Sequence, residues 1–254
     1  MLTQDDRPTL YAHITSSCTG RCQFCAPGVP VDRFSIEKLS SAILRRRWGR
    51  VAITGGEPTL DVELLSDALD AIAEADPGLH VGISTNGSGM LRLERPERIG
   101  SIALSRHHWD DDANRAIFGC AVPSLGDVGH LVDRLHLSLV CFKGGLATAD
   151  GIERYLDEAA EHSVGRVSIG ALFPQNYWCK ERRVSTIDVL DGIRRAVPTE
   201  RKEWRSCCEC RNYLYIPPDG CIVGVYAREL VGHKPRWIFD GQRLWEEPCS
   251  WRQS

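Results

Sequence analysis

Three cysteines near the start of the chain have the type and spacing that most clearly predict chemistry. The segment reads Cys18-Thr-Gly-Arg-Cys22-Gln-Phe-Cys25. Three thiolates on one short loop can bind one inorganic cluster, and a cubane of four irons held by three protein ligands keeps one iron open for another molecule. The alternatives are a zinc ion or cysteines that are buried for packing. The loop therefore predicts a metal site with an open coordination position.

A second motif, Gly55-Gly56-Glu57-Pro58, follows the next stretch of β-branched residues. Two glycines let the backbone approach a ligand closely, and Glu57 adds a carboxylate acceptor beside that backbone. The alternative is a tight turn between a strand and a helix, with Pro58 at the first helical position. The motif predicts a binding turn or a structural turn, depending on what lies beside it.

A third group of functional side chains is Arg106-His107-His108, which precedes a tryptophan and three aspartates. Arginine and histidine can hold an anionic group, and a histidine can move a proton near neutral pH. We expect at least one of these three residues to contact a cofactor or substrate. Asp110 or Asp111 is instead expected to cap a helix, because a side-chain carboxylate can accept from the free N–H groups of the first turn.

The elements that must position these residues alternate between strands and amphipathic helices. Strands are predicted at residues 9–15, 50–54, 79–85, 101–105, 135–141 and 166–172. Helices are predicted at residues 35–46 (with Ser35 as N-cap), 61–75, about 111–118, 148–162 and 186–197. Parallel neighbours need crossover helices, so this order predicts an α/β fold. Six units are too few for a closed eight-stranded barrel, so we expect a partial (β/α)6 barrel with a curved parallel sheet and a site at the carboxyl ends of the strands.

The remaining segment does not continue this alternation of strands and helices. Residues 1–197 are therefore predicted as the barrel domain and residues 198–254 as a small cysteine-rich module. The module contains Cys207, Cys208, Cys210, Cys221 and Cys249. Asp219-Gly220 predicts a hairpin turn between strands at 213–216 and 221–226. Cysteines that flank a hairpin can converge on one metal, so this module is a second candidate metal site.

The first two motifs together resemble the radical S-adenosylmethionine (SAM) superfamily. The resemblance lies in the Cys-x3-Cys-x2-Cys loop after the first strand, the aromatic Phe24 before its third cysteine, and the Gly-Gly-Glu-Pro motif after the second strand. It covers about residues 9–197 and implies a [4Fe–4S] cluster on Cys18, Cys22 and Cys25, with SAM as a second cofactor. The positions that the resemblance assigns to SAM are Phe24, Gly55, Gly56, Glu57, Pro58, Ser84, Asn86, Ser105, Arg106 and Leu172.

The resemblance also implies an enzymatic activity. The reduced cluster would cleave SAM to a 5′-deoxyadenosyl radical that abstracts hydrogen from a polar small-molecule substrate, in cofactor or natural-product biosynthesis, as an oxidoreductase or lyase. Arg106 could pair with the carboxylate of SAM through two hydrogen bonds, and Arg106, His107 and His108 are the candidate catalytic residues. A flavodoxin or ferredoxin is the implied electron donor. The alternatives are an activase of a glycyl-radical enzyme, a peptide-modifying maturase, or a metal-binding scaffold without catalysis.

The C-terminal module resembles the SPASM or twitch modules that bind an auxiliary cluster in several radical SAM subfamilies. That resemblance implies a possible second [4Fe–4S] cluster on Cys207, Cys210, Cys221 and Cys249. The spacing departs from one form of the module, in which the third cysteine matches the position of Gly224. Zinc, or no metal, stays an alternative for these cysteines.

Composition limits the other function classes. The chain has 254 residues with 31 Lys and Arg against 34 Asp and Glu, a net charge of −3. This balance does not favour nucleic-acid or anionic-membrane binding, and we expect no membrane span. The polar start of the sequence does not resemble a secretory signal, and clustered cysteines without one favour metal chemistry in the cytoplasm. The first predicted strand starts near residue 9, so no N-terminal peptide-recognition domain is expected.

Overall fold

A computed structural model describes residues 7–25, 28–196, 201–207, 210–215, 222–226 and 236–247. The described residues form two compact units. Unit 1 takes those within Met1–Thr19, Pro27–Ala103 and Pro235–Cys249, and unit 2 takes those within Gly20–Ala26, Leu104–Lys234 and Ser250–Ser254. The cysteine loop is divided between them, since Cys18 belongs to unit 1 while Cys22 and Cys25 belong to unit 2.

Unit 1 is built on a mainly parallel set of strands in the order β11-β10-β1-β2-β3-β4. The bounds are β1 Thr9–Thr15, β2 Arg50–Gly55, β3 His80–Thr85, β4 Ser101–Ser105, β10 Arg236–Phe239 and β11 Leu244–Glu247. β1 pairs in parallel with both β2 and β10, β2 pairs in parallel with β3, and β11 runs antiparallel to β10. The first three residues of β4 belong to unit 1 and its last two to unit 2.

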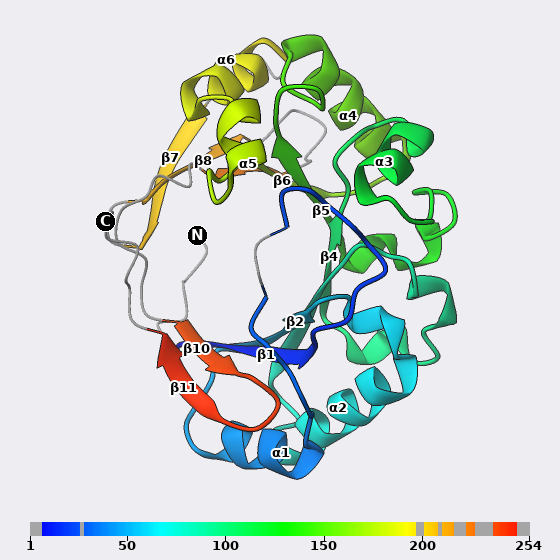
Figure 1. Cartoon of the computed structure of the whole chain (residues 1–254), viewed down its shortest axis with the longest axis vertical. Helices are drawn as coiled ribbons and strands as arrows, with labels where there is room; N and C mark the ends of the chain where they lie inside the picture. The colour runs from blue at the N-terminus through cyan, green and yellow to red at the C-terminus, as the bar shows by residue number, and fades with distance from the viewer. Residues whose placement is uncertain are drawn as a thin grey trace. The chain divides into compact units, whose positions relative to one another are not determined.

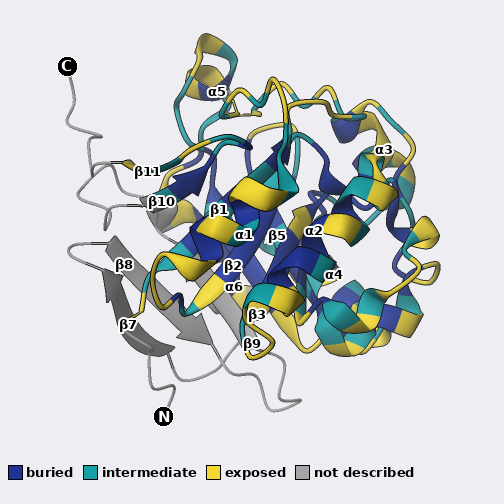
Figure 2. Ribbon diagram, turned by 90° about the horizontal axis from the view of Figure 1, so that it is seen from below, coloured by how far each residue is buried: buried dark blue, intermediate teal, exposed yellow. Residues whose placement is uncertain are grey.

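Two amphipathic helices, α1 (Ile36–Leu44) and α2 (Val62–Ala75), lie side by side in this unit, as Figure 1 shows. The predicted N-cap is confirmed, since the Ser35 side chain accepts from the Lys38 N–H at 3.2 Å. In Figure 2, α1 and α2 carry both buried dark-blue and exposed yellow residues, and the buried residues of β1 alternate with intermediate ones. Burial of the apolar side of each helix is what a 3.6-residue period predicts. The short 3-10 turns of this unit are η1 Pro58–Leu60, η2 Met90–Arg92 and η3 Pro96–Arg98.

Unit 2 continues the parallel strand–helix pattern with strands in the order β4-β5-β6-β9-β8-β7. The strand bounds are β5 Leu135–Cys141, β6 Arg166–Ala171, β7 Arg201–Cys207, β8 Cys210–Tyr215 and β9 Ile222–Tyr226. The helix bounds are α3 Asp111–Phe118, α4 Ala149–Glu161, α5 Tyr177–Arg182 and α6 Thr186–Ala196, with the 3-10 helix η4 at Gly129–Arg134. The six predicted barrel strands and the five predicted helices are thus present within a residue or two of the predicted bounds, whereas α5 was not predicted.

Two strands after residue 200, β9 and β10, pair with strands of the predicted barrel domain. β8 and β9 are antiparallel, as the predicted hairpin requires, and β9 lies parallel to β6. β10 lies parallel to β1 in unit 1. The pairing of β7 with β8 and the parallel contacts of β9 and β10 were not predicted, because edge pairing depends on distant residues rather than on the local pattern. The predicted domain boundary at residue 198 stays a prediction.

No helix among the described residues combines the length and the apolar composition that a membrane crossing requires.

Candidate active site

The Gly-Gly-Glu turn of unit 1 holds the backbone that leads directly into Cys18. The Gly56 N–H donates to the Thr15 carbonyl at 2.7 Å, and the Glu57 N–H donates to the Ser17 carbonyl at 2.8 Å. A Cβ atom at Gly56 would lie 2.1 Å from that Ser17 oxygen, and Gly55 has a φ of +137°. Glycine is therefore required here by close contact with protein backbone. This fits the structural turn that sequence analysis gave as one alternative, and contact of these glycines with SAM stays a prediction.

The Glu57 carboxylate is buried, with 1% of the residue exposed, and joins the turn to the end of β3. Its Oε1 accepts from the Thr59 N–H at 2.9 Å, the Thr59 hydroxyl at 2.7 Å and the Thr85 hydroxyl at 2.5 Å. Its Oε2 accepts from the Asn86 N–H at 2.7 Å. These bonds supply the partners that a buried carboxylate needs. The predicted contact of Glu57 with SAM stays a prediction, and Thr59 and Thr85 are partners that sequence reasoning missed.

Asn86 extends this network to the first cysteine of the loop. Its side-chain amide donates to the Thr19 hydroxyl at 3.1 Å and to the Cys18 sulfur at 3.9 Å. Its side-chain oxygen accepts from the Ser88 N–H at 2.9 Å. Ser84, which the resemblance also assigns to SAM, is exposed. Of these two predicted cofactor residues, the structure brings only Asn86 to the cysteine loop.

The base of the cysteine loop and the segment after it are also tied down within unit 1. The Val31 N–H donates to the Ser16 hydroxyl at 2.6 Å. Further on, the Ser35 N–H donates to the Gly241 carbonyl at 2.9 Å, in the turn between β10 and β11. The Gln242 side chain of the same turn donates to the Arg33 carbonyl at 3.1 Å. A strand pair from the far end of the sequence thus holds the segment that follows the loop.

In unit 2, the second half of the cysteine loop is held by the segment between β6 and α5. The Gln175 side-chain amide donates to the Phe24 carbonyl, and the Asn176 amide donates to the Gln23 carbonyl at 3.1 Å. The Phe24 ring packs against Trp178, with ring centroids 6.2 Å apart. Sequence reasoning missed Gln175 and Asn176, because a polar residue between two elements carries no sign of which distant carbonyl it will bind.

Phe24 and Leu172, both predicted to contact SAM, line the same cavity of unit 2. The cavity has a volume of about 160 Å³, and its walls also include Ser138, Val140 and Gln175. Pockets that enclose a whole drug-sized ligand usually measure about 300–1,000 Å³. The cavity is therefore large enough for part of a nucleoside-sized ligand and too small for all of SAM.

His107 lies deeply buried beside this cavity, and its ring is neutral near neutral pH. Its Nδ1 accepts from the Val140 N–H at 3.2 Å, so the neutral ring carries its proton on Nε2. The ring contacts the edge of Phe24 at 4.9 Å between centroids and stacks on Phe118 at 5.1 Å. Burial lowers the pKa of His107 to about 3. His107 thus supports one wall of the cavity, and its predicted catalytic role stays a prediction.

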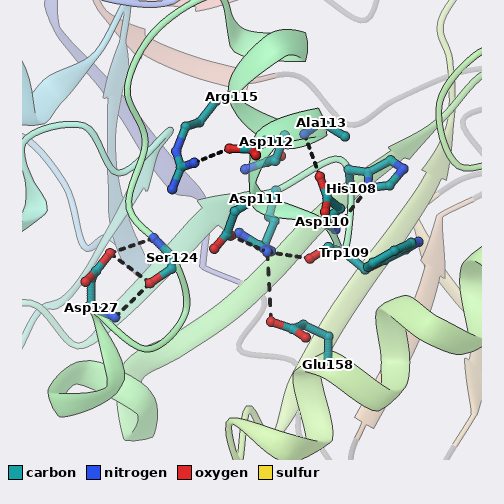
Figure 3. A network of polar contacts seen from close by, with 12 residues as sticks. His108, Trp109, Asp110, Asp111, Asp112, Ala113, Arg115, Ser124, Asp127 and Glu158 are labelled. Carbon is teal, nitrogen blue, oxygen red and sulfur yellow. Dashed lines mark hydrogen bonds and ion pairs between the residues drawn. The ribbon is translucent and has the colours of Figure 1, made fainter.

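The buried Arg106 guanidinium contacts Trp109, Asp111 and Glu158, and Figure 3 shows how these three partners lie. Its Nη2 donates to the Trp109 carbonyl at 2.7 Å and lies 2.7 Å from a carboxylate oxygen of Asp111 and 4.0 Å from one of Glu158. Only 1% of Arg106 is exposed. These contacts give its guanidinium two anionic partners inside the protein. The predicted pairing of Arg106 with the carboxylate of SAM therefore stays a prediction, without a contact that supports it.

His108 keeps its ring partly exposed. Its Nδ1 accepts from the Asp110 N–H at 2.9 Å, and burial lowers its pKa from the ordinary value. The Asp110 carboxylate caps α3 by accepting from the Ala113 N–H at 2.8 Å, which confirms the predicted helix cap. Ser105, the last residue of β4, is half-buried. Of the three predicted catalytic residues, His108 is the one whose side chain is open enough to meet another molecule.

The C-terminal cysteines are described only in part. Cys207 ends β7, Cys210 begins β8, and their Cα atoms are partners in the antiparallel register. Cys208, Cys221 and Cys249 lie outside the described residues. The predicted auxiliary metal site stays a prediction.

Residues 13–123 match the sequence model of the radical SAM superfamily. This part of the chain, which carries both motifs, is therefore similar to the radical SAM superfamily. The matched region contains the three cysteines of the first loop, the Gly-Gly-Glu-Pro turn, Asn86 and the Arg106-His107-His108 group. A comparison with curated protein sequences finds no match.

Solved structures of radical SAM proteins resemble the chain in fold. A radical SAM methyltransferase from Sphaerobacter thermophilus matches with a TM-score of 0.57 and 18% identity, over 76% of this chain and 64% of that one. Methylornithine synthase (PylB) matches with a TM-score of 0.50 and 14% identity, over 75% and 62%. The hydrogenase maturase HydG from Carboxydothermus hydrogenoformans matches with a TM-score of 0.50 and 16% identity, over 76% and 52%. The match covers less than two thirds of each of these proteins and confirms the predicted fold class, an α/β partial barrel.

Radical SAM proteins bind a [4Fe–4S] cluster and SAM, and the chemistry of the loop thiols fits the cluster. Cys18 and Cys25 are exposed and Cys22 is half-buried, so metal can reach all three. Cys141 differs, because it is fully buried and burial raises the pKa of its thiol to about 12. Among the described residues, no three His, Cys, Asp or Glu side chains are grouped so that they could hold a metal ion, so the cluster on these three cysteines stays a prediction.

Proposed function

We propose that this protein binds a [4Fe–4S] cluster through Cys18, Cys22 and Cys25 and cleaves SAM reductively. The observation that carries the proposal is the pair of hydrogen bonds from the Gly56 and Glu57 N–H groups to the backbone that precedes Cys18. They join the two family motifs into one structure on the carboxyl side of β1 and β2. Active sites of α/β barrels lie at that end of the strands.

The protein's own residues would hold the cofactors and keep water away. The three thiolates would bind the cluster, and the cavity lined by Phe24 and Leu172 would accept the adenine ring of SAM. His107 and Trp178 pack against Phe24 and fix its ring. When bound, the cluster supplies the electron that cleaves SAM to a 5′-deoxyadenosyl radical, which takes hydrogen from the substrate. The hard chemistry belongs to the cofactors, and the protein supplies position and a dry site.

The substrate that we propose is a polar small molecule, handled in the biosynthesis of a cofactor or natural product by an oxidoreductase or lyase reaction. His108 supports a polar substrate, because it is the partly exposed member of the Arg106-His107-His108 group and its neutral ring offers Nε2–H as a donor. A flavodoxin or ferredoxin would supply the electron. The oxygen sensitivity of a reduced cluster supports a cytoplasmic location.

We propose in addition that the C-terminal cysteines bind a second cluster. The support is the antiparallel register, which makes the Cα atoms of Cys207 and Cys210 partners across the β7–β8 connection. Two thiols on one tight connection can ligate the same metal. Counting iron in the Cys207→Ala/Cys210→Ala double variant tests this: loss of about four irons per chain supports a second [4Fe–4S] cluster, and unchanged iron contradicts it.

The primary activity is tested by reconstituting the full chain with iron and sulfide without oxygen. Reduced protein given SAM should release 5′-deoxyadenosine, and Cys22→Ala should release none and lose the cluster of the first loop. Cys141→Ala is the matched control, because that buried thiol stays protonated and should bind no iron. If the Cys22→Ala protein keeps full iron content and SAM cleavage, the proposed function is wrong.

A further inference from the structure

The hydrogen bond between the Asn86 side chain and Cys18 reaches the cluster loop from the end of β3. The Asn86 Nδ2 lies 3.9 Å from the Cys18 sulfur, a distance at which a sulfur atom can accept a hydrogen bond. It lies 3.1 Å from the Thr19 hydroxyl. Asn86 is 7% exposed, so water competes little for its N–H groups and their electrostatic effect is stronger than at the surface.

The orientation of the Asn86 amide is determined by its other partners. The Ser88 N–H can only donate, so the Asn86 group 2.9 Å away must be the oxygen, and the NH₂ group must then face Thr19 and Cys18. The Asn86 backbone is held as well, because its N–H donates to the buried Glu57 carboxylate at 2.7 Å. Both the backbone and the side chain of Asn86 are therefore held by hydrogen bonds, and its side-chain N–H group faces Cys18.

We propose that Asn86 is a positioning residue that raises the reduction potential of the cluster bound by Cys18, and that Glu57 keeps Asn86 in place. The proposal rests on the proposed function, since it requires that cluster. An N–H group that donates to a ligating sulfur stabilises negative charge on the sulfur. The reduced cluster carries one electron more than the oxidised one, so the bond stabilises the reduced state more. This assigns the Gly-Gly-Glu-Pro carboxylate a task within the protein, besides any contact with SAM.

The test is an anaerobic redox titration of the reconstituted protein, followed by electron paramagnetic resonance of the reduced cluster. Asn86→Asp keeps the oxygen that accepts from Ser88, removes both N–H donors and adds a negative charge. Asn86→Ala removes the donors without adding charge, because its methyl side chain can neither donate nor accept a hydrogen bond. Both variants should have a more negative potential, and Asn86→Asp should shift the reduction equilibrium by about tenfold, or 59 mV for a one-electron couple.

Ser88→Ala is the matched control, because it changes the same loop and removes a hydroxyl that lies 2.8 Å from Thr19 while it keeps the backbone donor to Asn86. It should have the wild-type potential. Thermal unfolding of each variant shows whether the fold is retained. The reduction potential by itself does not show this. A wild-type protein that forms no cluster contradicts the proposed function. Wild-type potentials in both Asn86 variants, with the cluster formed, overturn the inference.

Discussion

The buried neutral ring of His107 predicts that the protein loses stability in weak acid. In the folded chain burial lowers the pKa of His107 to about 3, against about 6.5 in an unfolded chain. The unfolded chain therefore binds a proton at a pH where the folded chain does not. When the pKa of a group is lower in the folded chain than in the unfolded chain, the free energy of unfolding is highest above the pKa of the unfolded chain. It decreases as the pH falls from there toward the pKa of the folded chain.

The magnitude follows from the two pKa values. Between about pH 7.5 and pH 5.0, protonation of the unfolded histidine removes about 2 kcal/mol from the free energy of unfolding. His107→Phe supplies the comparison, since a phenyl ring can keep the stack on Phe118 and the contact with Phe24. It does not titrate, and it leaves the Val140 N–H without its acceptor, a cost of about 1–3 kcal/mol at every pH.

Urea unfolding of both proteins, followed by tryptophan fluorescence at several pH values, measures this effect. The other titrating groups are shared by the two proteins, so they cancel in the difference between the two free energies of unfolding. At pH 7.5 the variant should be the less stable protein, and its deficit should shrink by about 2 kcal/mol at pH 5.0. A deficit that stays constant over this range would show that His107 is not held as a buried neutral ring, and the reasoning would be wrong.

Three further substitutions test the site and its supports. Gly56→Ala would place a Cβ 2.1 Å from a backbone oxygen and should lower the free energy of unfolding by more than about 1 kcal/mol, whereas Gly165→Ala, with open space around its Cβ position, should not. Unfolding curves of the two variants decide this. Asp110→Ala removes the cap of α3 and should cost about 1 kcal/mol in the same assay; an unchanged stability would mean that another group replaces the cap. Phe24→Ala opens the cavity wall and should weaken SAM binding to the reconstituted protein at least tenfold by equilibrium dialysis, and an unchanged affinity would place SAM elsewhere.

The local pattern was sufficient to predict the strands and all the helices but α5 in the barrel region, whereas β7, β10 and β11 were not predicted. Alternating strands and amphipathic helices have periods of about two and 3.6 residues that depend on neighbouring positions only, so the six barrel strands, the five helices, the Ser35 cap and the cap of α3 could be located. The cysteine motif and the glycine-rich motif could also be found in the sequence, since each occupies a few consecutive residues. The resemblance to the radical SAM superfamily followed from these motifs and their order along the chain.

The partners of the functional side chains could not be predicted in the same way. Glu57 and Arg106 were both assigned to SAM from their positions. In the fold, the Glu57 carboxylate accepts from the hydroxyl groups of Thr59 and Thr85. The Arg106 guanidinium pairs with the Asp111 carboxylate and donates to a carbonyl oxygen. A buried charge must be paired or hydrogen-bonded, and which groups pair with it depends on the residues that folding brings beside it.

Motifs and periodicity were enough to predict which functional groups the protein carries: three thiols on a loop, a glycine-rich turn after the second strand, and repeated units that form a parallel sheet. The contacts of these groups depended on the folded structure. It placed Asn86 against Cys18, closed a cavity around Phe24 and Leu172, buried His107 as a neutral ring, and set β10 beside β1. The physical reason is that motifs and periodicity are properties of neighbouring residues, whereas burial, hydrogen-bond partners and pKa depend on groups that are distant in the chain.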